Sequence, residues 1–249
     1  MNAEIDYEKI FVERGWRYLR ALNRFPGARA EEFKTAADKA RVEPGHRVID
    51  VPAGGGMLSR YLPEGCVAVR LECAPGFSSG DQLRSHARAD YSCWPLADAS
   101  AERVISVAGV HHVEDKRPFY HEAARCLAPG GVLLLAEVAE GSVIDTFLDG
   151  FIDRYNPQGH NGFYLNDQSL VDLEQAGLKI DSVTEQAYHW NFSSAADMHA
   201  YCSDQFGLKA IDQDQFVAEL GEYLPLEIDQ QQRVKLPWVL RHIRAIKPV

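Results

Sequence analysis

The feature that most constrains this chain is a glycine-rich turn that follows a short apolar run. Residues 48–56 read Val-Ile-Asp-Val-Pro-Ala-Gly-Gly-Gly, and residues 57–62 are expected to form a short helical segment. Glycines at a strand-to-helix turn let the backbone approach a ligand at a point where any Cβ would collide. The pattern predicts a nucleoside-binding crevice at the carboxyl edge of a parallel sheet.

A carboxylate ends the next apolar run, at Leu71-Glu72. An acidic residue at the end of the second strand is placed to accept hydrogen bonds from ribose hydroxyls. A dinucleotide fingerprint that starts at Gly54 needs a further glycine at position 59, where this chain has Ser59, and Asp50 would repel a pyrophosphate. S-adenosylmethionine carries an ammonium and a sulfonium but no phosphate, so the local charge favours this methyl donor over a dinucleotide.

Length and charge limit the partners. With 249 residues, of which 46% are hydrophobic, the chain can bury the core of one α/β domain. A formal net charge of −10 argues against a nucleic-acid partner, which needs a concentrated basic surface. Arg14, Arg17, Arg20 and Arg24 are spaced to share one side of a helix. An exposed or salt-bridged stripe is the main expectation, and an anion-attracting entrance for an acidic substrate is the alternative.

Cysteine usage and hydropathy bear on the compartment. The cysteines are scattered without a Cys-x-x-Cys pair, and their odd number fits a reduced, cytoplasmic setting; they are Cys66, Cys73, Cys93, Cys126 and Cys202. No apolar run is long enough to span a bilayer, and the first residues do not read as a secretory signal. We therefore expect a cytoplasmic protein with no membrane partner. The oligomeric state stays open, with a homodimer as one option.

Helices and strands are expected to alternate along a single domain. Near-continuous apolar runs such as 132–136 are typical of parallel strands that are covered on both faces. Residues 139–166, rich in glycine, aromatic and polar residues, are expected to form a loop or lid. The expected helices are 5–24, 29–41, 116–127, 167–176, 194–206 and 211–224, and the expected strands are 46–51, 67–72, 103–108, 132–138, 178–186 and 236–247.

Five segments in this order resemble the motifs of the class I S-adenosylmethionine-dependent methyltransferases that act on small molecules. They are Val48 to Gly56, Leu71-Glu72, Ala89 to Leu96, Val104 to Val113 and Cys126 to Gly131. The resemblance implies a Rossmann-like, doubly wound α/β fold with seven strands, mostly parallel, of which the last is antiparallel. It divides the chain into a helical cap (1–27), a cofactor-binding core (28–138) and a part with the substrate loop, a helical insertion and the last strands (139–249).

The same resemblance implies which residues contact the cofactor S-adenosyl-L-methionine. Pro52 stands where the motif has its first glycine, and proline donates no backbone hydrogen bond. Asp90 is implied to bind the adenine amino group with Tyr91 alongside the base, whereas a surface turn is the alternative. The implied cofactor contacts are Asp50, Pro52, Ala53, Gly54, Gly56, Glu72, Cys73, Asp90, Tyr91 and Ala108.

Candidate catalytic residues follow the fourth and fifth strands. His111 and His112 could take a proton from a nucleophile, as could Glu137, although packed histidines and catalysis by positioning alone remain alternatives. Tyr155, His160 and Tyr164 are candidate substrate contacts in the loop, while His160 could instead cap the following helix. A metal site made of His111, His112 and His160 is conceivable, but no pair shows metal-ligand spacing, so no metal is expected.

These observations favour transfer of a methyl group to a nucleophilic atom of a small-molecule acceptor, by in-line displacement at the sulfonium. Two alternatives remain open, because a fold does not dictate a reaction: another chemistry on the same cofactor, or a nucleoside-binding module without catalysis. A nicotinamide-dependent oxidoreductase is disfavoured by Ser59 and Asp50. The identity of the acceptor and of its methylated atom is not predicted.

Overall fold

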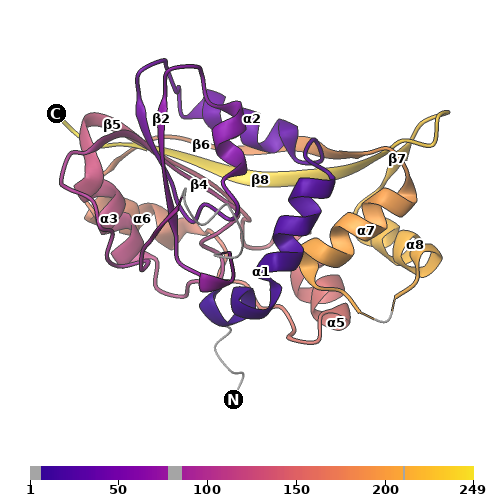
Figure 1. Ribbon diagram of the computed structural model, residues 1–249. Helices are drawn as coiled ribbons and strands as arrows, with labels where there is room; N and C mark the ends of the chain where they lie inside the picture. The colour runs from indigo at the N-terminus through magenta and orange to yellow at the C-terminus, as the bar shows by residue number, and fades with distance from the viewer. Residues whose placement is uncertain (1–6, 78–85, 210) are drawn as a thin grey trace.

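One twisted sheet with helices on both faces forms the centre of the computed structural model, which describes residues 7–77, 86–209 and 211–249 (Figure 1). The strand order is β3-β2-β1-β4-β5-β8-β6, and a short strand β7 pairs with β8 alone. The strands are β1 (Arg47–Asp50), β2 (Val67–Glu72), β3 (His86–Arg88), β4 (Ala101–Val107), β5 (Leu127–Glu137), β6 (Lys179–Phe192), β7 (Glu227–Ile228) and β8 (Val234–Ile246).

The direction of the strands confirms the expected topology. Neighbours from β3 to β5 pair in parallel, whereas β8 runs antiparallel to both β5 and β6. The predicted doubly wound sheet of seven strands, with the last one antiparallel, is therefore present, and β7 adds an eighth. The carboxyl ends of β1, β2 and β4 meet at one edge, as parallel pairing requires.

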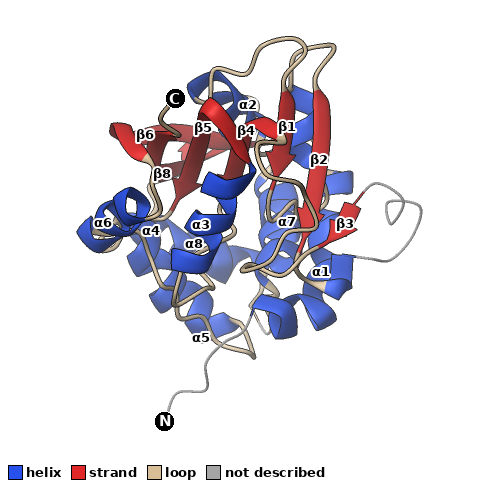
Figure 2. Ribbon diagram, turned by 90° about the vertical axis from the view of Figure 1, so that its left-hand side faces the viewer, coloured by secondary structure: helices blue, strands red, loops and turns tan. Residues whose placement is uncertain are grey.

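Helices occupy both faces of the sheet and the space below its carboxyl edge, where α1, α5, α7 and α8 gather (Figure 2). Among the described helices, four begin at a side chain that accepts a backbone hydrogen bond from the first turn, namely Ser142, Asn166, Ser194 and Asp212. The main helices are α1 (Tyr7–Arg24), α2 (Ala30–Lys39), α3 (Arg117–Cys126), α6 (Asp167–Gln175), α7 (Ala195–Phe206) and α8 (Gln213–Tyr223), and 3₁₀ turns form at η1 (Met57–Tyr61) and η2 (Pro75–Phe77). The first two residues of the predicted helix 5–24 lie outside the described residues.

The expectation of a loop over 139–166 is wrong for its first half. Helical backbone runs without a break through α4 (Val143–Thr146), the π-helical turn η4 (Phe147–Ile152) and α5 (Asp153–Tyr155). Ser142 caps the start by accepting a hydrogen bond from the Asp145 amide, and the rings of Phe147 and Phe151 stack 5.4 Å apart, one helical turn from each other. Burial of this aromatic face stabilises a helix where the glycines and polar residues suggested a loop.

Strand β5 contributes side chains to two hydrophobic cores, one on each face of the sheet. Leu133 and Leu135 pack on the face that α3 and α6 cover, while Leu134 and Ala136 belong to the other face, with α2 and the segment 144–152. All four side chains are fully buried. This burial on both faces explains the continuous apolar run in the sequence.

Strands β6 and β8 extend well beyond the other strands, toward α7 and α8 (Figure 1). β6 is 14 residues long and therefore continues past the predicted end at 186, with the alternating burial of a strand that has one covered face. Trp190 and Trp238 stack near this outer end, with their ring centroids 4.2 Å apart. Within the described part of the chain, no helix is long and apolar enough to cross a membrane.

Candidate active site

The glycine-rich turn after β1 is tied directly to the end of β2. Gly54 has a φ of 55° and Gly56 one of 69°, a region that side-chain-bearing residues rarely adopt. The Gly54 amide donates a hydrogen bond of 2.7 Å to Glu72 Oε2, and the Ala74 amide donates one of 2.9 Å to Oε1. The turn and the acidic residue that were expected to share a cofactor therefore lie side by side.

Pro52, which stands where the family motif has its first glycine, fills space between two turns. The Val51–Pro52 peptide bond is cis, and a Cβ built on Gly109 would lie only 2.3 Å from Pro52 Cγ. The proline ring therefore fills the space over Gly109 and joins the end of β1 to the turn after β4. Ala53 donates its backbone hydrogen bond to Leu71, at 2.8 Å, so the turn regains a link to β2 one residue later.

Asp50 is a buried carboxylate with one oxygen unsatisfied. Its side chain is 4% exposed, and Oδ2 has no hydrogen-bond partner among the described residues. Burial raises the pKa of Asp50 well above its ordinary value, an effect that Arg70 opposes and Glu72 reinforces. An ammonium group is the donor that would satisfy this oxygen, so the site fits the amino group of the expected methyl donor.

Asp90 and Tyr91 lie on the loop after β3. Asp90 is exposed and its Oδ1 accepts hydrogen bonds from the Ser92 amide and hydroxyl, at 2.7 and 2.6 Å, so the carboxylate caps a turn. The Tyr91 hydroxyl donates a hydrogen bond of 3.0 Å to the Gly109 carbonyl. Tyr91 thus reaches the carboxyl edge of the sheet. Asp90 caps a turn, and its contact with adenine stays a prediction.

Helix α1 lies across the glycine turn and η2. Tyr18 comes within 3.6 Å of the point where Gly54 would carry a Cβ, and Phe11 and Leu19 pack with Cys73 in a small apolar cluster. Cys73 is therefore buried under α1. The helix thus lies over the glycine turn and the end of β2.

A small, partly open cavity of about 50 Å³ lies next to this edge. Ala108, which has a φ of 48°, borders it where β4 ends, and aromatic and basic side chains from α1, α7, β6 and β8 form the remaining walls. The lining residues are Phe11, Arg14, Tyr18, Arg29, Ala108, His111, His112, Val138, Leu148, His160, Trp190, Gln205, Phe206 and Trp238.

Three histidines meet at one wall of this cavity. One ring nitrogen from each of His111, His112 and His160 lies within 4.8 Å of the other two, and the side chains are only 7–9% exposed. Burial lowers the pKa of His112 well below its ordinary value, and burial also lowers the pKa of His160. His112 and His160 are therefore neutral imidazoles near pH 7.

Glu137 stands behind this cluster rather than in it. Its Oε1 accepts hydrogen bonds from the Gly109 and Val110 amides, and Oε2 lies 3.0 Å from Nδ1 of His111. Both oxygens are thus engaged by the turn after β4 and by one imidazole. Glu137 is placed to orient His111, and not to contact a molecule in the cavity.

The arginine stripe of α1 divides into two groups. Arg17 and Arg20 form ion pairs with Asp204 of α7, as the salt-bridge interpretation expected. Arg14 is buried at the cavity, donates to the Phe206 carbonyl at 3.0 Å, and its Nε has no partner among the residues described. Burial lowers the pKa of Arg14 to about 10, so it still carries a charge.

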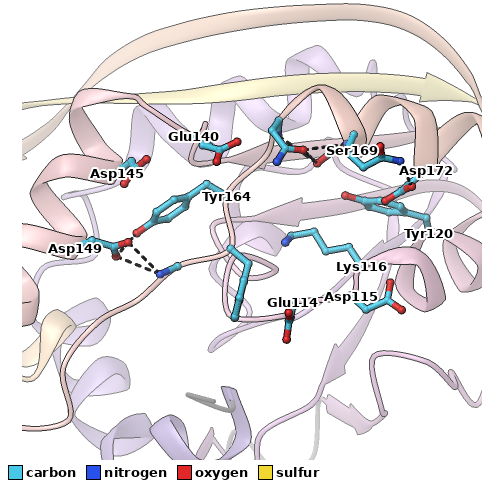
Figure 3. Close-up of a pocket in the computed structure, with 14 residues that line it drawn as sticks. Glu114, Asp115, Lys116, Tyr120, Glu140, Asp145, Asp149, Tyr164, Ser169 and Asp172 are labelled. Carbon is cyan, nitrogen blue, oxygen red and sulfur yellow. Dashed lines mark hydrogen bonds between the residues drawn. The ribbon is translucent and has the colours of Figure 1, made fainter. Parts of the chain in front are cut away.

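Two of the predicted substrate contacts lie elsewhere. The Tyr155 hydroxyl donates to Glu219 of α8 at 2.8 Å, so this residue links two helices instead of facing the cavity. Tyr164 donates to Asp149 at 2.6 Å and lines a separate acidic pocket (Figure 3). His160 alone of the three faces the cavity. Sequence reasoning passed over Arg29, Gln205 and Trp238, because no local pattern marks residues that only the folded chain brings together.

Comparison with known proteins agrees with this geometry. Residues 49–135 match the methyltransferase domain family. The chain is 29% identical over 166 residues to a ubiquinone biosynthesis O-methyltransferase of Xanthomonas axonopodis pv. citri, which covers 60% of this chain and 70% of that protein. Among solved structures, the YcgJ protein from Bacillus subtilis has a TM-score of 0.62 at 17% identity, covering 88% of this chain and 99% of that one. Phosphoethanolamine N-methyltransferase 2 of Haemonchus contortus, in complex with S-adenosyl-L-methionine, has a TM-score of 0.61 at 12% identity, covering 99% and 61%.

Proposed function

Since the chain belongs to the class I S-adenosylmethionine-dependent methyltransferases, we propose that it methylates a hydroxyl oxygen of a small aromatic acceptor held in the cavity under α1. The cavity would have to widen when the acceptor binds, because its volume of about 50 Å³ is smaller than the roughly 150 Å³ of a cavity that takes up a benzene ring. The observation that carries the proposal is the position of that cavity. It begins at Ala108, at the carboxyl end of β4, and runs between the histidine cluster and the Trp190–Trp238 stack. Any molecule in the cavity therefore lies directly beside the cofactor edge.

The residues proposed to hold the cofactor are those at the ends of β1 and β2. Asp50 would accept from the ammonium group through its unsatisfied oxygen, and Glu72 would accept from the ribose hydroxyls. Gly54 and Gly56 give the backbone room to approach the ligand. When bound, S-adenosyl-L-methionine supplies an electrophilic methyl group on a positively charged sulfur.

The choice of acceptor rests on the cavity walls and on the relative. Phe11, Tyr18, Phe206 and the stacked tryptophans offer flat apolar surface, which favours a planar ring over a flexible polar chain. The O-methyltransferase named among the relatives favours oxygen as the methylated atom. The chain would hold the acceptor in line with the methyl group and reduce its contact with water, because α1 covers one side of the cavity.

The proton of the acceptor hydroxyl has to leave during transfer. The imidazoles of His111 and His112 are the candidates to receive it, because they line the cavity directly. Glu137 would act as a positioning residue, since it bonds Nδ1 of His111 and two backbone amides. Tyr155 and Tyr164 are not part of this proposal, because neither lines the cavity.

Calorimetry with S-adenosylhomocysteine tests the cofactor half of the proposal. We expect binding to the wild-type chain and none to Gly54→Val, because a valine cannot adopt the backbone of the turn without strain. Gly130→Val is the matched control: Gly130 has a similar φ of 76°, but nothing lies within 4 Å of its Cβ position and it is in the turn within β5. Absence of binding to the wild-type chain at millimolar concentration would overturn the proposal.

Incubation with a labelled methyl donor and a panel of small phenols tests the reaction itself. Label in an ether product supports oxygen methylation. Cofactor consumption that leaves every phenol-derived product unlabelled, with the label kept in a fragment of the donor, would instead support the alternative of another chemistry on the same cofactor.

A further inference from the structure

We propose that His111, His112 and His160 bind a divalent transition-metal ion of the zinc class at the wall of the acceptor cavity. The inference rests on the proposed function only in taking that cavity as the acceptor site. The three residues come from the turn after β4 and from the loop after α5, segments far apart in the sequence. Their ring nitrogens converge within 4.8 Å, and tetrahedral zinc needs metal–nitrogen distances of about 2.0–2.1 Å, so small rotations would complete the set.

Carboxylates orient two of the three rings. Asp149 Oδ1 lies 2.8 Å from Nδ1 of His160, as Glu137 Oε2 lies 3.0 Å from Nδ1 of His111. A carboxylate that accepts from Nδ1 fixes the tautomer and leaves the lone pair of Nε2 directed away, which is the usual arrangement behind a metal-bound histidine. Histidines that only pack in a core do not need a carboxylate on Nδ1, whereas His111 and His160 each have one.

The carboxylates are themselves held in place. Asp149 accepts from the Tyr164 hydroxyl at 2.6 Å and from the Gly162 amide at 3.1 Å, and Glu137 accepts from two amides of the turn after β4. Such a supporting layer is what a rigid ligand set requires.

Local charge allows a cation at this point. Arg14 lines the same cavity and its guanidinium opposes a second positive charge. Glu137 and Asp149, both hydrogen-bonded to the ligand imidazoles, place two negative charges against it. Imidazole ligands without a thiolate select zinc, cobalt, nickel or copper over calcium and magnesium.

An acidic pocket behind Tyr164 offers a route for the ion. This pocket, of about 380 Å³, is lined by Glu114, Asp115, Glu140, Asp145, Asp149 and Asp172. In Figure 3, Asp149 and Tyr164 lie together on one side of it, and Lys116 reaches in from another. Asp149 therefore belongs both to the pocket and to the histidine cluster, and a wall of carboxylates raises the local concentration of cations.

A bound ion would sit where the acceptor hydroxyl is proposed to lie. Three protein ligands leave a fourth position for water or for an oxygen of the acceptor. A hydroxyl on such an ion would release its proton to solvent near neutral pH, because the imidazoles that bind the ion can no longer accept it. The ion would thus replace the imidazole as the group that favours ionisation of the acceptor.

The test is a titration of the chelator-treated full chain with Zn²⁺ against a chromophoric competitor, and with Co²⁺ by visible absorption. We expect one ion per chain and the intense absorption of four-coordinate Co²⁺. His160→Gln should weaken Zn²⁺ binding at least about 100-fold and Asp149→Asn about 10-fold or more. His242→Gln is the control, because His242 is a histidine outside the cluster that is buried even more deeply, and Zn²⁺ affinity should not change.

Thermal melts of each variant establish that it is folded, and the Asp149→Asn result stands if His160→Gln does not fold. No stoichiometric binding by the wild-type chain at micromolar Zn²⁺, or equal affinity in wild type and Asp149→Asn, would overturn the inference. Calorimetry with S-adenosylhomocysteine on the same samples separates the two proposals. Cofactor binding without metal binding removes only the metal site, whereas absence of cofactor binding removes the proposed function.

Discussion

The proposed cofactor edge and the proposed acceptor cavity of this protein are built in different ways. The cofactor edge, meaning the turn 50–56 with Glu72 and Gly109, is made by backbone at the ends of neighbouring parallel strands. The acceptor cavity is made by side chains from α1, the turn after β4, the segment 138–160, β6, α7 and β8. A binding site made of backbone tolerates few substitutions, whereas a cavity lined by side chains can be altered one residue at a time.

Helix α1 contacts both regions, and it packs directly against the backbone of Gly76 in η2. A Cβ on Gly76 would lie 1.5 Å from the Phe11 carbonyl oxygen, so Gly76→Ala forces α1 away from η2. We expect the free energy of unfolding to fall by about 3–5 kcal/mol. Because α1 gives three side chains to the cavity, methyl transfer should suffer more than binding of S-adenosylhomocysteine.

Urea denaturation and calorimetry measure the two effects. Gly221→Ala is the control, since nothing lies within 4 Å of its Cβ position in α8, and stability should stay the same or rise. Equal losses of cofactor binding and of turnover in Gly76→Ala would show that α1 serves both regions alike.

His242, in the sheet that both regions share, should make stability depend on pH. Burial, with a smaller effect of Lys39, lowers the pKa of His242 to about 4, against about 6.5 in the unfolded chain. Between these values the unfolded chain binds the extra proton, so stability is complete above pH 6.5 and falls as pH drops toward 4, by about 3 kcal/mol.

His242→Leu should remove this part of the pH dependence. The measurement is urea denaturation of both proteins at pH 7 and pH 5, with pH 8 as a reference where their difference should equal that at pH 7. A constant difference from pH 8 down to pH 5 would contradict the assigned pKa.

Asp50 tests the cofactor edge alone. Asp50→Asn keeps the shape but removes the negative charge that we propose to bind an ammonium group. Affinity for S-adenosylhomocysteine should fall by about 2 kcal/mol, or about thirtyfold, while the free protein becomes more stable because it no longer buries a carboxyl group whose ionised form burial disfavours. Calorimetry and thermal melts together check these opposite signs, and a loss of both affinity and stability would point to a structural role.

The ion pairs between α1 and α7 test the outer wall of the cavity. Asp204 receives Arg17 Nε at 3.3 Å and Arg20 Nε at 2.7 Å. Asp204→Asn should lower the free energy of unfolding by about 1 kcal/mol, and the difference should shrink in high salt because the pair is partly exposed. Denaturation at low and high ionic strength measures this, and S-adenosylhomocysteine binding should not change. An effect on cofactor binding would mean that the two regions are coupled through α1.

The cofactor edge could be predicted from the sequence because its determinants are local. Continuous apolar runs, glycines at a turn and an acidic residue after the next strand are all visible within residues 46–72, and the structure brings Gly54 and Glu72 into direct contact. The sheet topology followed from the same runs. Only the function of Pro52, which packs on Gly109 of a later turn, needed the folded chain.

The acceptor cavity could be predicted only in part because its contacts are long-range. Adjacent His111 and His112 gave a candidate pair, but nothing in their spacing indicates His160, which the loop after α5 delivers. Tyr155 was expected to face a ligand, and its partner Glu219 belongs to a helix more than sixty residues later. The helical backbone over 143–155 depends on tertiary burial of Phe147 and Phe151, which local composition does not reveal.

The long ribbon of β6 and β8 has a consequence for how such an enzyme could acquire new substrates. Trp190 and Trp238 sit on the part of the ribbon that projects past the other strands, paired with each other's strand and not with β5. A change in the length or register of that projection would reshape the wall of the cavity formed by Trp190 and Trp238. The strands β1, β2 and β4, at whose ends the cofactor is proposed to bind, would keep their neighbours. The overhang is thus a place where specificity can change without disturbing the strands that are proposed to hold the cofactor.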